Sequence, residues 1–400
     1  MRPLSIAFLA DHYVGWMGGA HLLANVLNCV NSVAVNQSVR VTVLMDIRAL
    51  GAAAEQTPDN LLNVEIANLK VSGPLQCLLD TTRIGQIVFY KDLRRAVADL
   101  SIQVMGPSSI NLGTDFPIPW FGYICDFQHQ YLPHLFSQQE RIQRDILFRS
   151  LVENATGVFV TSATAAVDVD RFYPAAARTK QVLRMPVALP DISTISPPEV
   201  VTSTYGIRRP YFLSCSQRWL HKQHPVILRA FADLISGEQK VQADLVFTGD
   251  TSDYRDPAYS AQVDALTASL GISDRVHVLG QIPRSDQLAL IRSSLALVQA
   301  SLFEGQAGAS GMMEAALIGT RMIASDLGTN RELPFGRTSY FPVDATGELT
   351  SRMASVLADC ASGDQPDRQA GAIPFDPPSR QLLEMASGLN LLASLRSAVQ

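Results

Sequence analysis

The sequence has few of the features that mark specialised classes of protein. Its cysteines are odd in number and widely spaced, and no two form a CxxC pair: Cys29, Cys77, Cys125, Cys215 and Cys360. This usage is typical of free thiols in a reducing compartment and argues against a structural zinc site. Charged residues make up 17% of the chain, the net charge is −5, and the arginines are scattered. A nucleic-acid-binding surface, which needs clustered positive charge, is therefore not expected.

Long apolar runs are also missing. No run approaches the ~20 residues that a membrane-spanning helix needs. The first 16 residues are apolar only briefly before they pass into a strand-and-loop pattern, so no signal peptide is predicted. We therefore expect a cytoplasmic protein that makes at most peripheral contact with the inner face of a membrane.

The chain does have a regular alternation of apolar strand patterns and helical patterns. This alternation predicts an α/β protein, and 400 residues exceed what one hydrophobic core usually serves. One strand pattern starts at Leu4 and another at Tyr211, after a stretch rich in proline, serine and threonine that predicts a linker. The expected segments are a first domain (1–190), a linker (191–209), a second domain (210–378) and a final amphipathic helix (379–400).

The most informative stretch runs from Leu297 to Pro334. An apolar run at residues 294–300 predicts a buried strand, and a loop of small residues follows it. A helix then begins near Ser310 and ends at Gly319, and Met322–Ser325 predicts the next strand. In open parallel sheets, loops at the carboxyl ends of strands bind ligands. This loop is therefore the first candidate for a binding site.

The residue types in this stretch point to one kind of ligand. Unpaired amides at the helix start, at Ser310, Gly311 and Met312, form an anion site that a phosphate can approach closely. Glu314, one turn further on, can accept hydrogen bonds from the hydroxyls of a ribose. Glu304, at the mouth of the loop, can face a sugar beyond the phosphates. Phosphate, ribose and sugar together describe a nucleotide sugar.

The same stretch resembles the donor-binding motif of family-4 retaining glycosyltransferases of the GT-B fold. The matching pieces are Glu304-Gly305, Glu314-Ala315, Gly319-Thr320 and Ser325-Asp326, and Asn330-Arg331-Glu332 follows as in a bacterial surface-polysaccharide subgroup. The family usually has seven residues between its glutamates, whereas this chain has nine, so counting back from Glu314 reaches Gln306. Either Glu304 or Gln306 faces the sugar. We expect Glu304, because the alanines and glycine that follow can bulge at little cost.

Two stretches of the first half also resemble this subgroup. An apolar strand at residues 117–124 leads to a polar cluster in which Asp126 and His129 are candidate catalytic residues at the sheet's carboxyl edge. Near the N-terminus, Gly18 and Gly19 lie in a loop before a helix expected at about Ala20–Val30. In related enzymes this loop approaches the donor, although a tight turn between strand and helix explains the glycines equally well.

Two further segments complete the expected donor site. Lys222 stands where the family's lysine holds the donor diphosphate, and Arg218 lies one position away from the family's arginine. The segment around Gly280 packs against the donor base through backbone groups in related enzymes. Together these matches place donor binding in the second domain.

The resemblance implies two Rossmann-like domains facing a cleft, with the terminal helix crossing back to the first. The implied reaction is retaining transfer of a hexose, with mannose as our guess, from an NDP-sugar. The acceptor would be a saccharide or a lipid-linked saccharide in surface-polysaccharide synthesis. No metal and no cofactor are expected, because Lys222, Arg218 and the helix start near Ser310 would stabilise the departing diphosphate. A nucleotide-sugar epimerase and a catalytically inactive nucleotide-binding partner subunit remain alternatives. A nicotinamide oxidoreductase is disfavoured, because the three-glycine fingerprint is missing.

Overall fold

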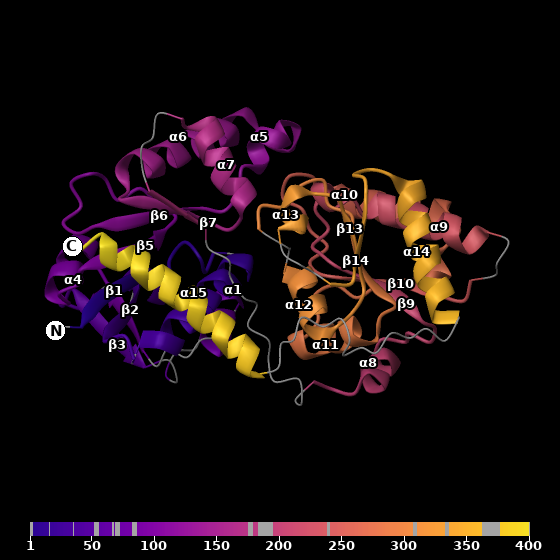
Figure 1. The fold of residues 1–400 in the computed structure, drawn as a ribbon, viewed down its shortest axis with the longest axis horizontal. Coiled ribbons are helices and arrows are strands. Elements are labelled where there is room, and N and C mark those ends of the chain that lie inside the picture. Colours follow the sequence, from indigo (N-terminus) through magenta and orange to yellow (C-terminus); the bar gives the residue numbers. More distant parts are fainter. Residues whose placement is uncertain are drawn as a thin grey trace. The chain divides into compact units, whose positions relative to one another are not determined.

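The computed structural model divides into two compact units, which are described separately (Figure 1). Unit 1 consists of Met1–Phe127, Gln138–Ala188 and Asp376–Gln400, and unit 2 consists of Gln128–Ser137 and Leu189–Phe375. The structure describes residues 3–15, 17–34, 36–51, 56–65, 68, 73–81, 86–174, 179–182, 195–237, 241–306, 310–332, 336–361 and 377–399.

Unit 1 is built on an eight-stranded sheet with the order β3-β4-β2-β1-β5-β6-β7-β8. All neighbouring strands are parallel except β3, which runs antiparallel to β4. The strands β1, β5, β6 and β7 are almost entirely buried, because helices cover both faces of a parallel sheet. The strands are β1 (Leu4–Leu9), β2 (Val39–Asp46), β3 (Leu61–Glu65), β4 (Gln86–Tyr90), β5 (Val104–Ser108), β6 (Trp120–Ile124), β7 (Gly157–Val160) and β8 (Thr179–Val182).

Two hydrophobic cores lie on opposite faces of this sheet. Ile6 and Phe8 of β1 belong to the core under α1 (Met17–Ala34), α3 (Gly73–Thr81) and α15 (Pro377–Ser397). Ala7 and Leu9 point the other way, as the two-residue repeat of a strand requires. They join the core that contains α4 (Leu93–Asp99), α6 (Gln138–Asn154) and α7 (Ala163–Phe172).

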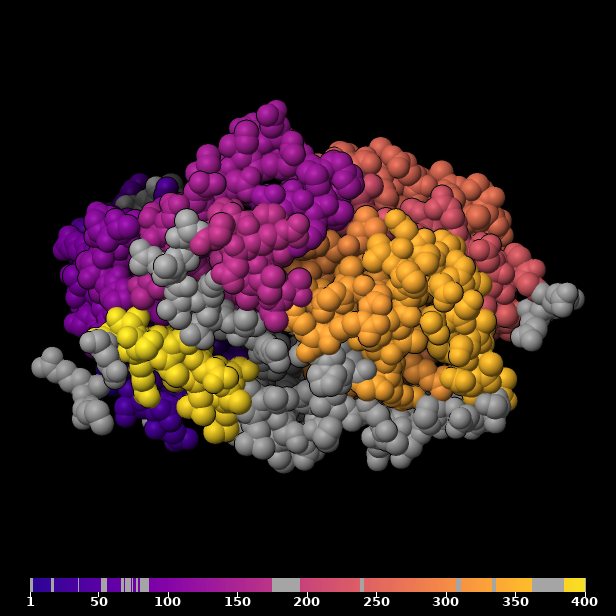
Figure 2. All heavy atoms as spheres, turned by 45° about the horizontal axis from the view of Figure 1, so that its top comes forward, coloured from indigo at the N-terminus to yellow at the C-terminus, as the bar shows by residue number. Residues whose placement is uncertain are grey.

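The final helix, α15, packs against α1 in unit 1, and it is yellow in Figures 1 and 2. Gly388 lies where the two helices approach closely, because a Cβ atom there would overlap the carbonyl oxygen of Cys29. Further along α15, Arg396 Nη1 donates to Gln37 Oε1 at 3.0 Å. Gly388 therefore allows a close helix–helix contact that a larger residue would prevent.

Unit 2 is built on a six-stranded, all-parallel sheet with the order β11-β10-β9-β12-β13-β14. Figure 1 shows α9 and α14 on one face and α11 and α12 on the other. The strands are β9 (Tyr211–Cys215), β10 (Asp244–Thr248), β11 (Val276–Val278), β12 (Ala296–Gln299), β13 (Met322–Ser325) and β14 (Thr338–Phe341). The helices include α8 (Pro198–Thr204), α9 (His224–Ser236), α10 (Tyr259–Ser269), α11 (Arg284–Ser293), α12 (Ser310–Ile318), α13 (Gly328–Arg331) and α14 (Thr346–Ala361).

The predicted α/β class with two Rossmann-like sheets is confirmed. The predicted linker is corrected, because α8 lies inside residues 191–209 and packs against α11 of unit 2. Tyr205, just after α8, donates to Asp286 Oδ2 at 2.7 Å. A helix this short shows no clear periodicity, so the sequence pattern missed it. Residues 191–194 of the predicted linker lie outside the described part of the chain.

A second difference concerns residues 128–137. They hold α5 (Gln128–Tyr131) and the 3₁₀ helix η3 (Pro133–Leu135), and they belong to unit 2 although both flanking stretches belong to unit 1. The prediction had placed them within a first domain of residues 1–190. Among the described helices, none is long and apolar enough to cross a membrane.

Candidate active site

The candidate site of unit 2 lies where the order of its strands reverses. The chain proceeds from β9 outward through β10 and β11, and later from β12 outward through β13 and β14. Since β9 and β12 are neighbours, with Leu213 opposite Leu297, the loops that follow them emerge side by side at the carboxyl edge. Such a switch point is the usual ligand site of an open parallel sheet.

Two predicted site residues meet at this switch point. Lys222 Nζ lies 2.6 Å from Glu304 Oε1, and the exposed fractions of the two side chains are 16% and 10%. Gln299 Nε2, at the end of β12, also donates to Glu304 Oε1 at 2.8 Å. Leu302 N donates to the carbonyl oxygen of His221 at 2.8 Å, so the two loops are also joined through their backbones. The structure thus brings a partly buried cation and a partly buried carboxylate together at one point.

The start of α12 lies at the same edge of the sheet. Gly311 packs over the end of β9, because a Cβ atom at Gly311 would lie 3.6 Å from Cys215 Cβ and 3.7 Å from its carbonyl oxygen. The side chain of Met312, in the first turn of α12, is fully buried. The amides of the first turn, from Ser310 to Met312, are the predicted anion site, and that role stays a prediction. Residues 307–309 of the loop lie outside the described part of the chain.

Glu314 is buried inside unit 2 and contacts α11. Its Oε1 lies 2.6 Å from Arg284 Nη2, and its Oε2 accepts from Gln287 Nε2 at 3.3 Å. Burial raises the pKa of the Glu314 carboxyl, and the charge of Arg284 partly offsets that effect. The side chain predicted to hold a ribose is therefore already oriented by two donors of a neighbouring helix.

Arg218 points toward α10. Its Nη1 donates to Ser260 Oγ and to Asp264 Oδ1, both at 2.8 Å, and the side chain is buried. Its backbone amide donates to the carbonyl oxygen of Asp250 at 2.7 Å. The predicted contact between Arg218 and a diphosphate stays a prediction, but in this structure the guanidinium is already bound to α10.

Gly249 brings three loops of the carboxyl edge into contact. Its φ is +116°, and a Cβ atom there would lie 2.7 Å from the backbone carbon and oxygen of Ser216. The amide of Gly249 donates to the carbonyl oxygen of Gly280 at 2.8 Å. Only glycine fits this position, since both the dihedral angle and the space exclude a side chain. Gly280, the predicted contact of the donor base, thus lies beside the loop that carries Arg218 and Lys222.

The predicted residues of the first half lie in different units. Asp126 belongs to unit 1, where Arg144 Nη1 lies 3.7 Å from its Oδ1. His129 belongs to the segment of unit 2 that contains α5, where its buried ring packs edge-on against Phe136 with centroids 6.4 Å apart. Their predicted catalytic roles are not tested by this geometry.

The glycine loop near the N-terminus is corrected. The helix that was expected from Ala20 begins at Met17, so Gly18 and Gly19 lie in the first turn of α1. Their amides are therefore among the unpaired donors of a helix start. Trp16, which precedes them, lies outside the described residues. The predicted contact between these glycines and the donor stays a prediction.

A polar cluster that was not among the predicted site residues follows β10. Asp253 and Arg255 form an ion pair there, with Arg255 Nε 3.0 Å from Asp253 Oδ1, and both side chains are buried. The signal was present, because charged residues directly after the apolar strand Asp244–Thr248 must lie at the carboxyl edge. The same rule had singled out Asp126 in the first half.

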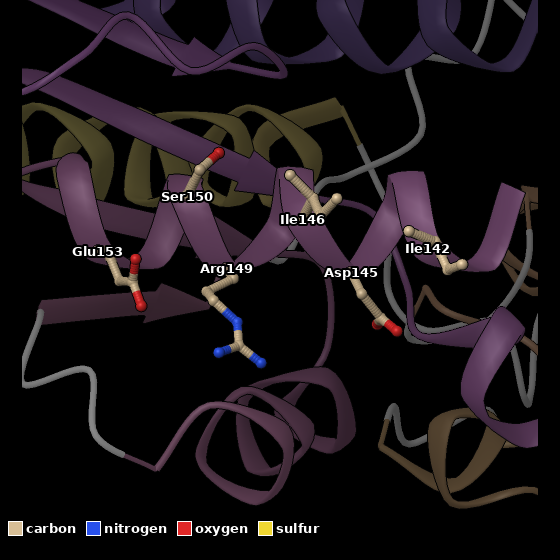
Figure 3. A pocket seen from close by; sticks show the side chains of 6 residues that line it. All are labelled: Ile142, Asp145, Ile146, Arg149, Ser150 and Glu153. Atoms are coloured by element: carbon tan, nitrogen blue, oxygen red, sulfur yellow. The ribbon is translucent and has the colours of Figure 1, made fainter. Parts of the chain in front are cut away.

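A surface pocket of unit 1 lies elsewhere. Figure 3 shows the side chains that line it, all from the single helix α6: Ile142, Asp145, Ile146, Arg149, Ser150 and Glu153. One helix alone does not bring polar groups from several elements to one point, as ligand sites do. Within the described ranges, no group of three or more His, Cys, Asp or Glu side chains could hold a metal ion.

Residues 206–334, which lie within unit 2 and include Lys222, Glu304 and Glu314, match the family model for glycosyl transferases group 1. No curated protein matches the sequence.

Several solved structures share the fold. Sucrose-phosphate synthase from Thermosynechococcus elongatus has a TM-score of 0.65 at 16% identity, over 98% of each chain. HepE of Anabaena in complex with UDP-glucose has a TM-score of 0.66 at 15% identity, over 98% of this chain and 100% of HepE. WaaG, a glycosyltransferase involved in lipopolysaccharide biosynthesis, has a TM-score of 0.56 at 16% identity, over 96% of this chain and 93% of WaaG. These likenesses confirm the expected arrangement of two Rossmann-like sheets in one chain.

Proposed function

We propose that this chain, a glycosyltransferase with a group 1 domain in unit 2, transfers a hexose from an NDP-sugar to a saccharide or lipid-linked acceptor with retention at the anomeric carbon. The observation that carries the proposal is the ion pair between Lys222 and Glu304 at the switch point of the unit 2 sheet. The bound UDP-glucose of HepE supports a nucleotide sugar as the donor.

Charge explains how this site would favour the reaction. Breaking the bond between sugar and diphosphate leaves negative charge on the diphosphate oxygens. Lys222 and the amides at the start of α12 lie at the same sheet edge, where they would bind that charge as it develops. Charge-assisted hydrogen bonds of this kind are about twice as strong as neutral ones. We infer that these groups suffice for catalysis without a metal ion.

Glu304 would act on the other fragment, the sugar. A carboxylate near the anomeric carbon stabilises the positive charge of an oxocarbenium-like transition state, which an amide does poorly. Lys222 and Gln299 both hold the Glu304 carboxylate in place. Gln306 makes no hydrogen bond among the described residues, so the contacts favour Glu304 as the sugar-facing residue.

Glu314 and the first-half residues would bind the remaining parts of the two substrates. The orientation of Glu314 by Arg284 and Gln287 supports a fixed acceptor for ribose hydroxyls. Asp126 and His129 would contact the acceptor. The role of WaaG in lipopolysaccharide biosynthesis supports a surface-polysaccharide acceptor for the present chain.

A nucleotide-release assay tests the proposal and separates it from its alternatives. The protein is incubated with UDP-glucose, UDP-galactose or GDP-mannose, with and without a panel of saccharide and lipid-linked acceptors, in EDTA. We expect acceptor-dependent release of one nucleotide diphosphate and a product whose anomeric configuration, read by NMR, equals that of the donor. Conversion of the donor sugar without an acceptor would instead identify an epimerase. Nucleotide binding without release would identify an inactive partner subunit.

A further inference from the structure

Arg255 is a buried cation that contacts several loops of unit 2. Only 6% of its side chain is exposed, and its partner Asp253 is fully buried. Its Nε donates to Asp253 Oδ1 at 3.0 Å, and its Nη2 donates to Asp253 Oδ2 at 3.3 Å. This two-point contact fixes the plane of the guanidinium, which a lysine ammonium could not do.

The same pair holds the short turn that carries Lys222. This turn is the 3₁₀ helix η5 (Leu220–Lys222). Asp253 Oδ2 accepts a hydrogen bond from the amide of Leu220 at 3.2 Å. The Arg255 guanidinium lies over the Trp219 ring, 5.0 Å from its centroid, and its Nη2 is 3.4 Å from His221 Nδ1. The pair therefore touches the residue before η5 and the first two residues of η5, but not Lys222 itself.

The contact with His221 fixes the charge and the tautomer of its imidazole ring. A guanidinium can only donate, so His221 Nδ1 must accept and the ring must be neutral with its proton on Nε2. Burial lowers the pKa of His221, and the positive charges of Lys222 and Arg255 lower it further. The carbonyl oxygen of the same residue accepts from Leu302 N, two residues before Glu304. His221 thus connects Arg255 to the loop that holds Glu304.

Arg255 also reaches the segment of unit 2 that carries His129. Its Nη1 donates to Gln128 Oε1 at 3.1 Å, and its guanidinium lies 5.6 Å from the centroid of the Phe136 ring. Gln128 is the first residue of α5, and Phe136 follows η3. One guanidinium is therefore bound both to the segment that carries His129, a predicted contact of the acceptor, and to the turn that carries Lys222, the predicted contact of the diphosphate.

We propose that Arg255 is a positioning residue for the donor site: through Asp253 and His221 it holds Lys222 opposite Glu304, and through Gln128 it holds α5 in the same unit. This inference rests on the proposed function, in which Lys222 binds the donor diphosphate. It assigns to Arg255 no contact with substrate. Loss of Arg255 should act by displacing Lys222, so its effect on nucleotide binding should require Lys222.

A double-mutant cycle measures that dependence. UDP binding is measured by calorimetry for the wild type, Arg255→Lys, Lys222→Ala and the double variant. Arg255→Lys is expected to weaken UDP binding roughly tenfold in the wild type but less than about twofold in Lys222→Ala, because residues joined by one hydrogen-bond network couple whereas independent ones add. Equal losses in both backgrounds would overturn the inference while leaving the role of Lys222 intact. Should the wild type bind neither UDP, GDP nor dTDP, the proposed function and this inference both fail.

Arg275→Lys is the matched control. Arg275 is another largely buried arginine paired with a buried aspartate, since its Nε lies 3.1 Å from Asp244 Oδ1. Asp244 begins β10, at the end of the strand away from the site. Arg275→Lys should lower thermal stability without changing UDP affinity. A similar loss of UDP affinity in Arg275→Lys would show that the Arg255 effect is only a general loss of folding.

The tautomer of His221 gives a second test, which can be carried out on the wild type alone. In the wild type, ¹⁵N NMR of His221 should show the neutral ring protonated on Nε2 and unprotonated on Nδ1 at neutral pH. A ring protonated on Nδ1 could not accept from Arg255 and would overturn the inference. In Arg255→Lys this single signature should be replaced by a mixture of tautomers.

Discussion

Lys222 Nζ and Glu304 Oε1 lie 2.6 Å apart although 82 residues of sequence separate the two side chains. The register between β9 and β12 explains the contact, because it sets the two loops next to each other at the carboxyl edge of the sheet. Each side chain neutralises the charge of the other in a partly buried place, where an isolated charge would be costly. The Lys222 ammonium has three N–H donors, so it can bind a diphosphate while it keeps its contact with Glu304.

Replacing Lys222 with alanine should weaken binding of the nucleotide diphosphate. The loss of one charge-assisted phosphate contact is expected to cost about 1.5–3 kcal/mol of binding free energy. Calorimetry with UDP and GDP measures it. Arg352→Ala, which removes an exposed cation of α14, is the control and should leave binding unchanged. Unchanged affinity in Lys222→Ala, or wild-type affinity that EDTA abolishes, would contradict this prediction.

Glu304→Gln should lower turnover and leave the affinity for the nucleotide diphosphate nearly intact. The amide keeps the size of the side chain but removes the charge that stabilises the transition state of the sugar. Gln306→Ala is the matched variant and should retain turnover. Initial rates with a working donor and acceptor, together with calorimetry, separate the two effects. Turnover that survives in Glu304→Gln but disappears in Gln306→Ala would reverse the assignment of the sugar-facing residue.

Arg284→Met should destabilise unit 2 more than Glu314→Gln does. The first change leaves a carboxylate that is 1% exposed without its cation, whereas the second leaves a guanidinium that is 33% exposed and can be hydrated. An unpaired buried charge costs about 1–3 kcal/mol or more. The double variant should therefore be more stable than Arg284→Met alone. The free energy of unfolding of each variant is measured in urea. Glu314→Gln should also weaken nucleotide binding, and unaltered binding would argue against its ribose contact.

Gly388→Ala should destabilise the chain. A Cβ atom at this position meets a backbone oxygen of α1, so the two helices must separate, at a cost of about 1–3 kcal/mol. Gly347→Ala on α14 is the control, since a Cβ atom there meets nothing within 4 Å. That change should stabilise by about 0.4–1 kcal/mol because it restricts the unfolded chain. The melting temperatures of both variants, measured by thermal unfolding, test these two expectations. Equal shifts of the melting temperature would contradict the close contact between the helices.

His224→Gln should make the stability of the chain less dependent on pH. Burial lowers the pKa of His224 to about 3, so between pH 6.5 and 3 the unfolded chain binds a proton there that the folded chain does not. The folded state thus loses stability as the pH falls through this range, by up to about 1.4 kcal/mol per pH unit. Urea unfolding at pH 7, 6 and 5 gives the slope of the free energy of unfolding against pH, which should be smaller in His224→Gln than in the wild type. His134→Gln, at an exposed position of η3, controls for the loss of an imidazole.

Much of the fold was predictable because buried parallel strands are short apolar runs with sharp ends. Met322–Ser325 was predicted with both of its limits, and the strand predicted to start at Tyr211 does start there. Short elements without a full period, such as α8 and α5, gave no such pattern. Their positions are fixed by contacts with distant residues, which no local sequence pattern records.

The site was predictable to the extent that its residues follow strands. The register of β9 and β12 makes neighbours of Lys222 and Glu304, and both positions had been singled out from the sequence. The partners of each side chain could not be predicted in the same way. Arg218 bonds to α10 and Glu314 bonds to α11, and those contacts depend on how each helix packs on the sheet. Arg255 was missed because its guanidinium bonds to Gln128 and His221, which are far from it in sequence.

Each unit consists of segments that are separated in the sequence by segments of the other unit. This order determines when each unit can fold completely during synthesis. Gln128–Ser137 emerges from the ribosome long before Arg255, the residue of unit 2 to which Gln128 bonds. Unit 1, in turn, lacks α15 until all of unit 2 has been synthesised, and Arg396 then contacts Gln37 across 359 residues. Neither unit can therefore be obtained intact as a continuous fragment. A piece that begins at residue 189 would lack the Gln128 oxygen and the Phe136 ring that contact Arg255 in the whole chain.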